Sequence, residues 1–473
     1  MQPRCRDFPA NVRAALADAP LQAALAKTAG GFPKKRLQGI ATLPEFELMR
    51  DRATAIREHV LDHLDFYLEE FAERVEATGG QVHWCADAEA ARAAVLGICQ
   101  AAGARTVTKG KSMIGEEIAI NDHLERHGIR PVETDLGEYI IQLRGETPSH
   151  IVAPAIHVSQ AQVAETFRAH HRGLPPGRPL ETPRQLLTEA RETLRREFLA
   201  ADVGITGANL LVAETGTSLI VTNEGNGDLT QTLPRVHIVL ASIEKLVPTL
   251  EDATTVLRVL PRSITGQEMT VYTTFSSGPR RPGDPDGPEQ FHVVLLDNGR
   301  SELLGGELRA ILRCIRCGAC LGHCPIWSNV GGHAYGWIYS GPMGAALTPA
   351  LLGLPEAWHL PQASTLCGRC EAVCPVRIPI PQLLRRWRAR AWSAGKPPGV
   401  ARPLLRAWAW LARRPRLYHR LSNLAARVLA RLGRGGALRS LPGAGGWCRS
   451  RDLPAPEGRT FLAQWQARRG GRE

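Results

Sequence analysis

The 473-residue sequence predicts an α/β fold with a mainly parallel sheet, followed by a smaller α-helical module. Two observations carry this prediction. Short apolar strands alternate with helical patterns between residues 81 and 296, and two runs of cysteines follow them. Such alternation is typical of parallel sheets, whose strands are connected by helices. A chain of this length can form two or three domains, each with its own core.

The predicted elements follow in order along the chain. Residues 1–75 are predicted to be helical, because apolar residues recur every three or four positions within 45–71. Gly and Pro punctuate 276–288 (SSGPRRPGDPDGP), which predicts a long loop before the last strand. Helices are expected at 88–102, 114–127 and 183–199. Strand-forming segments are expected at 81–84, 106–108, 130–134, 207–222, 234–240 and 291–296.

Seven of the eleven cysteines fall into two runs. The first reads C-x2-C-x2-C-x3-C-P and comprises Cys314, Cys317, Cys320 and Cys324, followed by Pro325. This is the spacing of bacterial two-cluster ferredoxins, in which the last cysteine of a run ligates the other cluster. Three thiolates at three-residue intervals can surround one cubane, while the cysteine before the proline is turned away from it. The 42 residues between the runs favour an α-helical ferredoxin-type module over a compact β-rich one.

The second run is incomplete, because Ser364 stands where its first cysteine is expected. Two [4Fe-4S] clusters with crossed ligands are therefore predicted, the second with only three cysteines. Its fourth iron is left to Ser364, water, a partner group or nothing. Zinc sites usually take paired C-x2-C units, and disulfides need an oxidising compartment, so both alternatives fit the pattern less well. The predicted ligands are Cys314, Cys317, Cys320 and Cys374 for cluster one, and Cys324, Cys367 and Cys370 for cluster two.

The remaining cysteines lie outside any ligand spacing and are interpreted as incidental thiols: Cys5, Cys85, Cys99 and Cys448. The first 32 residues contain no unbroken apolar segment of a secretory signal, and no stretch approaches the roughly 18 apolar residues of a membrane span. We therefore expect a cytoplasmic protein without a transmembrane segment, in a compartment where thiols stay free to bind iron.

The net charge of +12 is concentrated at the C-terminal end of the chain. Residues 381–473 contain 21 Lys and Arg against three acidic residues, whereas the preceding 380 residues carry a net charge of −6. Apolar residues alternate with arginines in 403–411 and 417–432, which predicts amphipathic basic helices. Such helices bind a membrane surface, nucleic acid or an acidic partner, or pack on their own protein with a solvated arginine face.

Several polar motifs could indicate binding or catalytic sites. Gly110-Lys111-Ser112 lacks the glycine that a P-loop requires at position 105, where Arg105 stands. Gly225-Asn226-Gly227 fails as a dinucleotide fingerprint because Thr230 occupies the third small position. Glu214 lies in a Gly- and Thr-rich tract at a strand end, where a structural turn is favoured over a catalytic carboxylate. His123, His127, His150 and His157 show no metal-ligand spacing.

Three blocks of the chain together resemble the lactate-utilisation iron–sulfur protein family (LutB-like). The resemblance covers about 8–466 and is more specific than any single motif. The first block is 108–118 (TKGKSMIGEEI) with 132–143 and 148–151, and the second is 213–216 (AETG) with 223–225. The third is the pair of cysteine runs with 331–336 (GGHAYG) between them. Trp447 and 451–454 (RDLP) in the tail also fit.

The resemblance implies a LUD domain, similar in fold to ribose-5-phosphate isomerase and CoA-transferases, followed by the ferredoxin-type module. It also implies that serine at position 364 is a shared feature of the family. The resulting domain prediction is 1–75 for an N-terminal helical segment, 76–300 for the LUD domain, 301–395 for the two-cluster module and 396–473 for the basic extension.

The resemblance further implies an electron-transfer subunit of a cytoplasmic complex that oxidises L-lactate to pyruvate. The implied partners are a cysteine-rich-domain protein and a smaller LUD protein, and no electron acceptor is indicated. No catalytic residue is assigned. Two alternatives stay open: a catalytic LUD domain with Glu214 as nucleophile or base, and an iron–sulfur redox sensor. Against nucleic-acid binding by such a sensor, the chain shows charge but no recognisable binding module.

Overall fold

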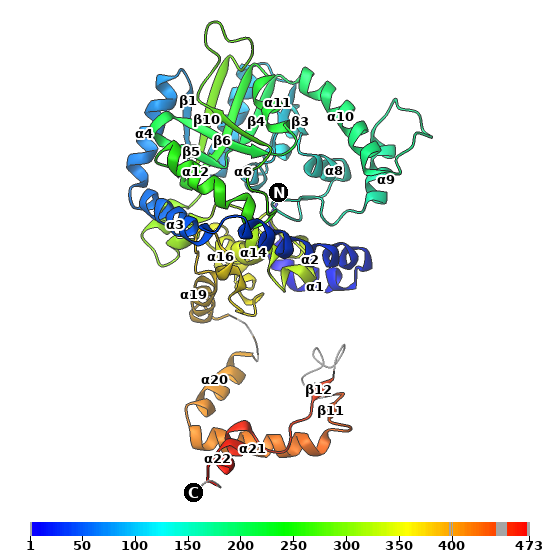
Figure 1. The fold of residues 1–473 in the computed structure, drawn as a ribbon, viewed down its shortest axis with the longest axis vertical. Helices are drawn as coiled ribbons and strands as arrows, with labels where there is room; N and C mark the ends of the chain where they lie inside the picture. Colours follow the sequence, from blue (N-terminus) through cyan, green and yellow to red (C-terminus); the bar gives the residue numbers. More distant parts are fainter. Residues whose placement is uncertain (1, 397–398, 400, 441–451, 471–473) are drawn as a thin grey trace. The chain divides into compact units, whose positions relative to one another are not determined.

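The computed structural model describes residues 2–396, 399, 401–440 and 452–470, and Figure 1 shows the course of the chain. The chain forms two compact units, which divide between Arg390 and Ala391. Three residues named above, Trp447, Cys448 and Arg451, lie outside the described residues.

Helices occupy most of the chain up to Ala77, as the periodicity predicts. Helix α2 begins after Asp18, whose carboxylate accepts a hydrogen bond from the Leu21 N–H at 3.0 Å. Pro20 lies in the first turn of α2, where its missing N–H leaves no helical bond unmade. These helices are α1 (Phe8–Ala17), α2 (Ala19–Ala41), α3 (Phe46–Asp62) and α4 (Leu64–Ala77).

A six-stranded sheet forms the centre of the α/β region, with strand order β1-β10-β7-β4-β2-β3. All of its pairings are parallel, which confirms the predicted fold class. Strand β7 is buried along its whole length, as expected of a parallel sheet that is covered on both faces. The strands are β1 (Gln81–Cys85), β2 (Thr106–Lys109), β3 (Arg130–Glu133), β4 (Val203–Gly207), β7 (Val236–Ser242) and β10 (Gln290–Leu296).

Helices connect these strands. Those at 88–102 and 183–199 are as predicted, whereas four others were not predicted: Leu136–Arg144, Gln160–His170, Asn226–Thr232 and Leu250–Val259. The expected single helix at 114–127 is wrong, because the chain breaks at Ala119, whose φ of 52° is left-handed and cannot continue an α-helix. The helices of this region are α5 (Ala88–Ala101), α6 (Met113–Glu117), α7 (Ile120–Arg126), α8 (Leu136–Arg144), α9 (Gln160–His170), α10 (Pro183–Ala200), α11 (Asn226–Thr232) and α12 (Leu250–Val259).

A second sheet of four short strands, in the order β8-β5-β6-β9, was not predicted. The turn between β5 and β6 ends at Gly216, which has a φ of 65°. A Cβ atom there would lie 2.6 Å from the Val75 nitrogen of α4, so only glycine lets the helix pass so closely. The strands are β5 (Leu210–Val212), β6 (Thr217–Thr222), β8 (Leu246–Val247) and β9 (Tyr272–Ser276).

The cysteine-rich module is built from short helices and loops, and no strand occurs between residues 301 and 390. Its buried core is continuous with that of the N-terminal helices and the second sheet, since Leu25, Val247, Trp327 and Leu383 belong to one cluster. The helices are α13 (Ser301–Leu304), α14 (Ala319–Gly322), α15 (Trp327–Val330), α16 (Gly341–Leu351), α17 (Leu354–Ala357), α18 (Arg369–Ala372) and α19 (Ile380–Ser393).

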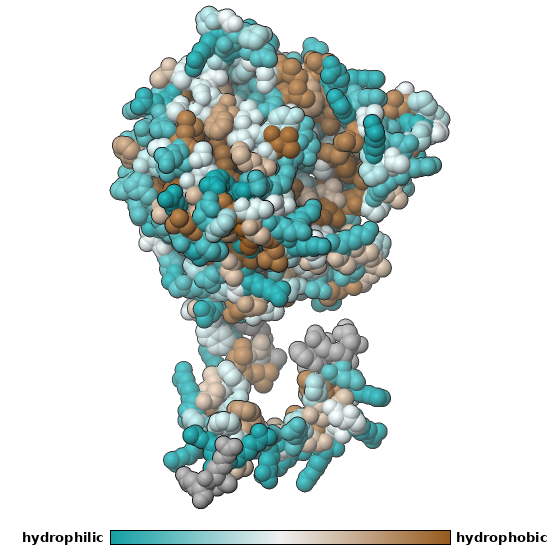
Figure 2. Space-filling model, in the orientation of Figure 1, coloured by the Kyte–Doolittle hydropathy of each residue, from teal (hydrophilic) through white to brown (hydrophobic). Residues whose placement is uncertain are grey.

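The C-terminal unit consists mainly of amphipathic helices. In α21, apolar residues at helical spacing are 37–55% exposed: Leu417, Leu421, Leu424 and Val428. Figure 2 shows brown apolar residues interleaved with teal polar ones over this unit. Within the described ranges, no helix is long and apolar enough to span a membrane. The elements are α20 (Ala401–Ala412), α21 (Pro415–Leu432), β11 (Ala437–Leu438), β12 (Leu453–Pro454) and α22 (Phe461–Gly470).

Candidate iron–sulfur site and adjoining pocket

The structure gathers four cysteines from both runs around one small cavity. Cys314, Cys317 and Cys320 line it from the loop before α14 and from α14 itself, and Cys374 reaches it from the second run. Burial is the main cause that raises the pKa of Cys317, and the nearby Cys374 thiol raises it further. The four cysteines assigned to cluster one from spacing therefore lie together in the fold.

The three cysteines assigned to cluster two also lie near one another. Burial, followed by the neighbouring Cys324 thiol, raises the pKa of Cys370 to about 12, and Cys367 acts in the same direction. Cys367 differs from the other two because it is exposed. Its pKa is lowered, mainly by a hydrogen bond from the Arg369 N–H. One edge of this group thus faces solvent.

The two runs share a backbone geometry around their cysteines. Arg316 and Leu366, which precede Cys317 and Cys367, have left-handed φ angles of 58° and 55°. In the first run the Arg316 N–H donates to Cys314 Sγ at 3.4 Å, and in the second the Leu366 N–H donates to Ser364 Oγ at 3.1 Å. Ser364 therefore holds the place in the second run that Cys314 holds in the first.

The donor set fits iron–sulfur clusters. Thiols in two groups supply the ligand type that such clusters require, and backbone N–H groups point at the sulfurs. Trp327 N donates to Cys324 Sγ at 3.5 Å, and Ile378 N donates to Cys374 Sγ at 3.4 Å. Over the described residues no three Cys, His, Asp or Glu side chains converge on a point that would hold a single metal ion. A cubane instead takes its thiolates on separate iron atoms.

Buried ion pairs join the cysteine module to the α/β region. Arg300, which is fully buried, contacts Glu117 Oε2 at 2.6 Å and Glu244 Oε2 at 3.1 Å. Glu244 also contacts Arg316 at 3.3 Å. Burial alone would raise the pKa of Glu244, but Arg300 and Arg316 outweigh it and lower that pKa to about 2. The carboxylate stays ionised, and it anchors the first cysteine loop by its charge.

A cavity of about 240 Å³ lies beside this loop. Gly110 to Met113 line it at the carboxyl end of β2, and Gly207 to Asn209 line it at the carboxyl end of β4. The chain passes from β2 to β3 on one side of β2 and then returns to β4 on the other. Ligand sites of open α/β sheets occur at such switch points. Arg316 and Cys317 of the first cysteine run complete the wall.

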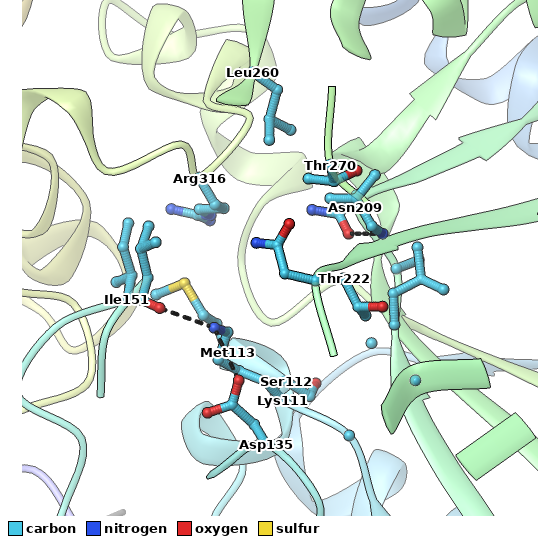
Figure 3. Close-up of a pocket in the computed structure, with 18 of the residues that line it drawn as sticks. Lys111, Ser112, Met113, Asp135, Ile151, Asn209, Thr222, Leu260, Thr270 and Arg316 are labelled. Atoms are coloured by element: carbon cyan, nitrogen blue, oxygen red, sulfur yellow. Dashed lines mark hydrogen bonds and ion pairs between the residues drawn. The ribbon is translucent and has the colours of Figure 1, made fainter. Parts of the chain in front are cut away.

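The cavity is lined by charged, amide and hydroxyl groups (Figure 3). Lys111 Nζ contacts Asp135 Oδ2 at 3.4 Å and donates to the Val152 carbonyl at 3.1 Å. Burial would lower the pKa of Lys111, but the carboxylates of Asp135 and Glu138 outweigh it and raise that pKa. Burial, reinforced by Arg316, lowers the pKa of Lys245 to about 8, so its ammonium stays mainly protonated at pH 7.

Glu214, the carboxylate considered as a catalytic group, does not line this cavity. Its side chain is exposed, and Oε1 accepts a hydrogen bond from the Leu250 N–H at 2.6 Å at the start of α12. The structural turn favoured by the sequence is what the fold contains.

Sequence reasoning rejected Gly110-Lys111-Ser112 as a P-loop and thereby overlooked Lys111 as a pocket residue. The position of this segment directly after a strand was the signal that could have identified it.

The fold and the cysteine groups define a class of protein: an α/β domain joined to an iron–sulfur module. Comparison with family models supports each part. Residues 68–296 match the LUD domain, 310–378 match the 4Fe-4S dicluster domain, and 393–470 match the C-terminal domain of lactate utilisation protein B.

Curated relatives extend over nearly the whole chain. Lactate utilization protein B of Lysinibacillus sphaericus is 41% identical, covering 96% of this chain and 95% of the relative. The protein of that name from Bacillus licheniformis is 42% identical, covering 92% and 91%. An uncharacterized electron transport protein, YkgF, of Escherichia coli is 40% identical, covering 96% and 95%. The chain belongs to the lactate utilization protein B family, as the sequence motifs predicted.

Among solved structures, a DUF162 family protein from Deinococcus radiodurans matches 49% of this chain and 98% of its own, with 15% identity and a TM-score of 0.26.

Proposed function

We propose that this lactate-utilisation iron–sulfur protein is the electron-carrying subunit of a complex that oxidises L-lactate to pyruvate. The observation that supports the proposal best is the grouping of seven thiols from two runs into sets of four and three within one module. Oxidation of lactate to pyruvate releases two electrons and two protons. When bound, each [4Fe-4S] cluster supplies one-electron redox chemistry, so two neighbouring clusters suit a two-electron donor.

In this proposal Cys314, Cys317, Cys320 and Cys374 hold cluster one, and Cys324, Cys367 and Cys370 hold cluster two. The chain itself supplies the thiolates and the N–H groups that donate to them. Cys367 is exposed, so an edge of cluster two would face solvent, where a partner could exchange electrons with it. The proposed partners are a cysteine-rich-domain protein and a smaller LUD protein of the same system.

The proposal is tested with protein prepared without oxygen, alone and together with the products of neighbouring genes. The protein alone should contain seven to eight irons with matching sulfide, as two ferredoxin half-sites require. With its partners present, L-lactate should bleach the visible absorption of the clusters. Stoichiometric zinc with little sulfide would refute the cluster assignment. Clusters that dithionite reduces but lactate with partners does not would refute the role in lactate oxidation.

A further inference from the structure

The cavity at the carboxyl ends of β2 and β4 contains a cation, Lys245, that forms no ion pair within the described residues, although the Glu244 carboxylate and the Cys314 thiol lie near it. Lys245 lines the cavity and is 7% exposed. Across the described residues, no hydrogen bond or ion pair joins its ammonium to another group. Glu244, its neighbour in sequence, is instead engaged by Arg300 and Arg316. The Lys245 side chain is buried while its ammonium faces the cavity, where an anion that enters can pair with it.

Several neutral groups in the wall can donate hydrogen bonds to a ligand. The carboxylates that also line the cavity are those of Asp135, which contacts Lys111, and of Glu224. Asn209 Oδ1 accepts from the Val221 N–H at 3.0 Å, which leaves its amide NH₂ for the cavity (Figure 3). Asn223 Oδ1 is likewise occupied, by Gln267 Nε2 at 3.0 Å. The hydroxyl of Thr222 is buried without a partner. The cavity therefore offers hydrogen-bond donors beside a positive charge.

The size and the apolar part of the wall limit what this anion can be. About 240 Å³ is less than the 300–1,000 Å³ typical of drug-sized ligands. Met113, Ile151 and Leu260 add an apolar surface suited to a short alkyl group. Inorganic phosphate would leave this surface unused, whereas a short organic acid would use both parts of the wall.

We propose that this cavity binds a small 2-hydroxy or 2-oxo carboxylate, with its carboxylate at Lys245 and Arg316 and its second oxygen at Asn209 or Thr222. The proposal deepens the proposed function, on which its choice of substrate class rests. Cys317 lines both this cavity and the one that gathers the cysteines of cluster one. Only Cys317 would thus separate the bound acid from the proposed cluster. The acid would bind inside this subunit and not in a partner.

Calorimetric titration of the full-length, anaerobically prepared protein tests the site without any partner. Pyruvate and L-lactate should bind, whereas lactamide, which lacks the negative charge, should not bind measurably. Lys245→Gln should weaken binding at least about tenfold, as expected for loss of a hydrogen bond to a charged group. Lys27→Gln, which changes an exposed lysine on α2, is the matched control and should leave binding unchanged.

Asn209→Asp provides a second variant in case Lys245→Gln does not fold. It retains the acceptor for the Val221 N–H but places a negative charge in the cavity, so it should also abolish binding of the acid. Unchanged visible spectra would show that both variants retain their clusters. In the reduced wild type, pyruvate should perturb the electron paramagnetic resonance signal of one cluster, and it should fail to do so in Lys245→Gln.

Absence of binding to the wild type, or equal binding of lactamide and pyruvate, would overturn the inference. Binding that survives both substitutions would also overturn it. These results are separable from the proposed function. If lactate with partners reduces the clusters although the isolated protein binds no acid, only the inference fails. If the acid binds through Lys245 but lactate never reduces the clusters, only the proposed electron-transfer role fails.

Discussion

Ser364 is the residue at which the second cysteine run departs from the first. Its hydroxyl accepts the hydrogen bond from Leu366 N–H that Cys314 Sγ accepts from Arg316 N–H. The backbone N–H that would donate to a thiolate ligand is therefore present in the second run, but it donates to a hydroxyl oxygen. A neutral hydroxyl binds iron more weakly than a thiolate does, which leaves the proposed cluster two with a labile corner.

Ser364→Cys should consequently stabilise this cluster. On mild oxidation the wild type should lose one iron and give a three-iron signal in electron paramagnetic resonance, and the variant should suppress that signal. Ser393→Cys, at an exposed position, controls for the effect of an added thiol. If the three-iron signal is equally strong in Ser364→Cys and the wild type, position 364 does not lie at the vulnerable iron.

At the residue scale, the sequence allowed the cysteines to be assigned but not the cations around them. Cysteine spacing follows directly from cluster geometry, so Cys374 could be grouped with Cys314 across sixty residues. Lys245 carries no comparable signal. The role proposed for it depends on burial beside β8 and on the ion pairs of Glu244 with two arginines, which only the fold reveals.

At the scale of the elements, the start of α12 explains the position of the Glu214 carboxylate, which caps this helix. Glu214 accepts from the Leu250 N–H, and the N-cap Thr249 accepts from the Asp252 N–H at 3.1 Å. Two of the N–H groups at the start of the helix, which have no partner within it, are thereby satisfied. This arrangement accounts for Glu214 without any catalytic role.

Glu214→Gln should therefore leave lactate-driven reduction unchanged and lower the free energy of unfolding by no more than about 1 kcal/mol, since the amide oxygen can still accept the bond. Thermal unfolding followed by circular dichroism measures the stability, and Thr249→Ala should show a cost of similar or greater size. Loss of lactate-driven reduction in a folded Glu214→Gln protein would revive the catalytic alternative.

The strands of the parallel sheet other than β4 were predicted to within about two residues, whereas the short strands of the second sheet were not. Strands β7 and β10 carry runs of four apolar residues, which identify them, whereas β4 is interrupted by Gly204 and Thr206. The second sheet contains β8, with two residues, and β5, with three, and neither is long enough to show a period. The break between α6 and α7 depends on the left-handed φ of Ala119, and alanine gives no warning of such a turn.

At the scale of the whole molecule, the excess of basic residues lies mostly in the C-terminal compact unit. The net charge of +18 in 381–473 falls mostly on the unit that begins at Ala391. Its helix α21 carries exposed arginines together with the exposed apolar face described above. Net charge bears on association more than on folding, so we propose that this unit binds an acidic partner subunit.

Truncation after Gly395 should leave iron and sulfide content unchanged, because every proposed ligand lies upstream. It should weaken assembly and abolish reduction by lactate, while dithionite still reduces the clusters. A full-length variant with Arg420, Arg427 and Arg431 changed to Gln separates charge from bulk and should also assemble poorly. In the wild type, assembly should weaken with added salt, since exposed charges are screened within about 8–10 Å. Lactate-driven reduction at the full rate in the truncated protein would exclude this unit as the docking surface.

Arg57 of α3 has a consequence for how this chain can be divided. Its guanidinium is 1% exposed and donates to main-chain carbonyls on two sides: Leu246 at 2.6 Å in the α/β region, and Leu312 at 3.0 Å just before the first cysteine run. Cutting the chain near residue 300 would leave the buried Arg57 guanidinium without part of its acceptors in one fragment, and the Leu312 and Arg313 carbonyls without their donor in the other. The LUD and iron–sulfur portions are therefore not independent domains that can be exchanged between proteins. A chimaera that grafts this module onto a foreign LUD domain would need α3 to come with it.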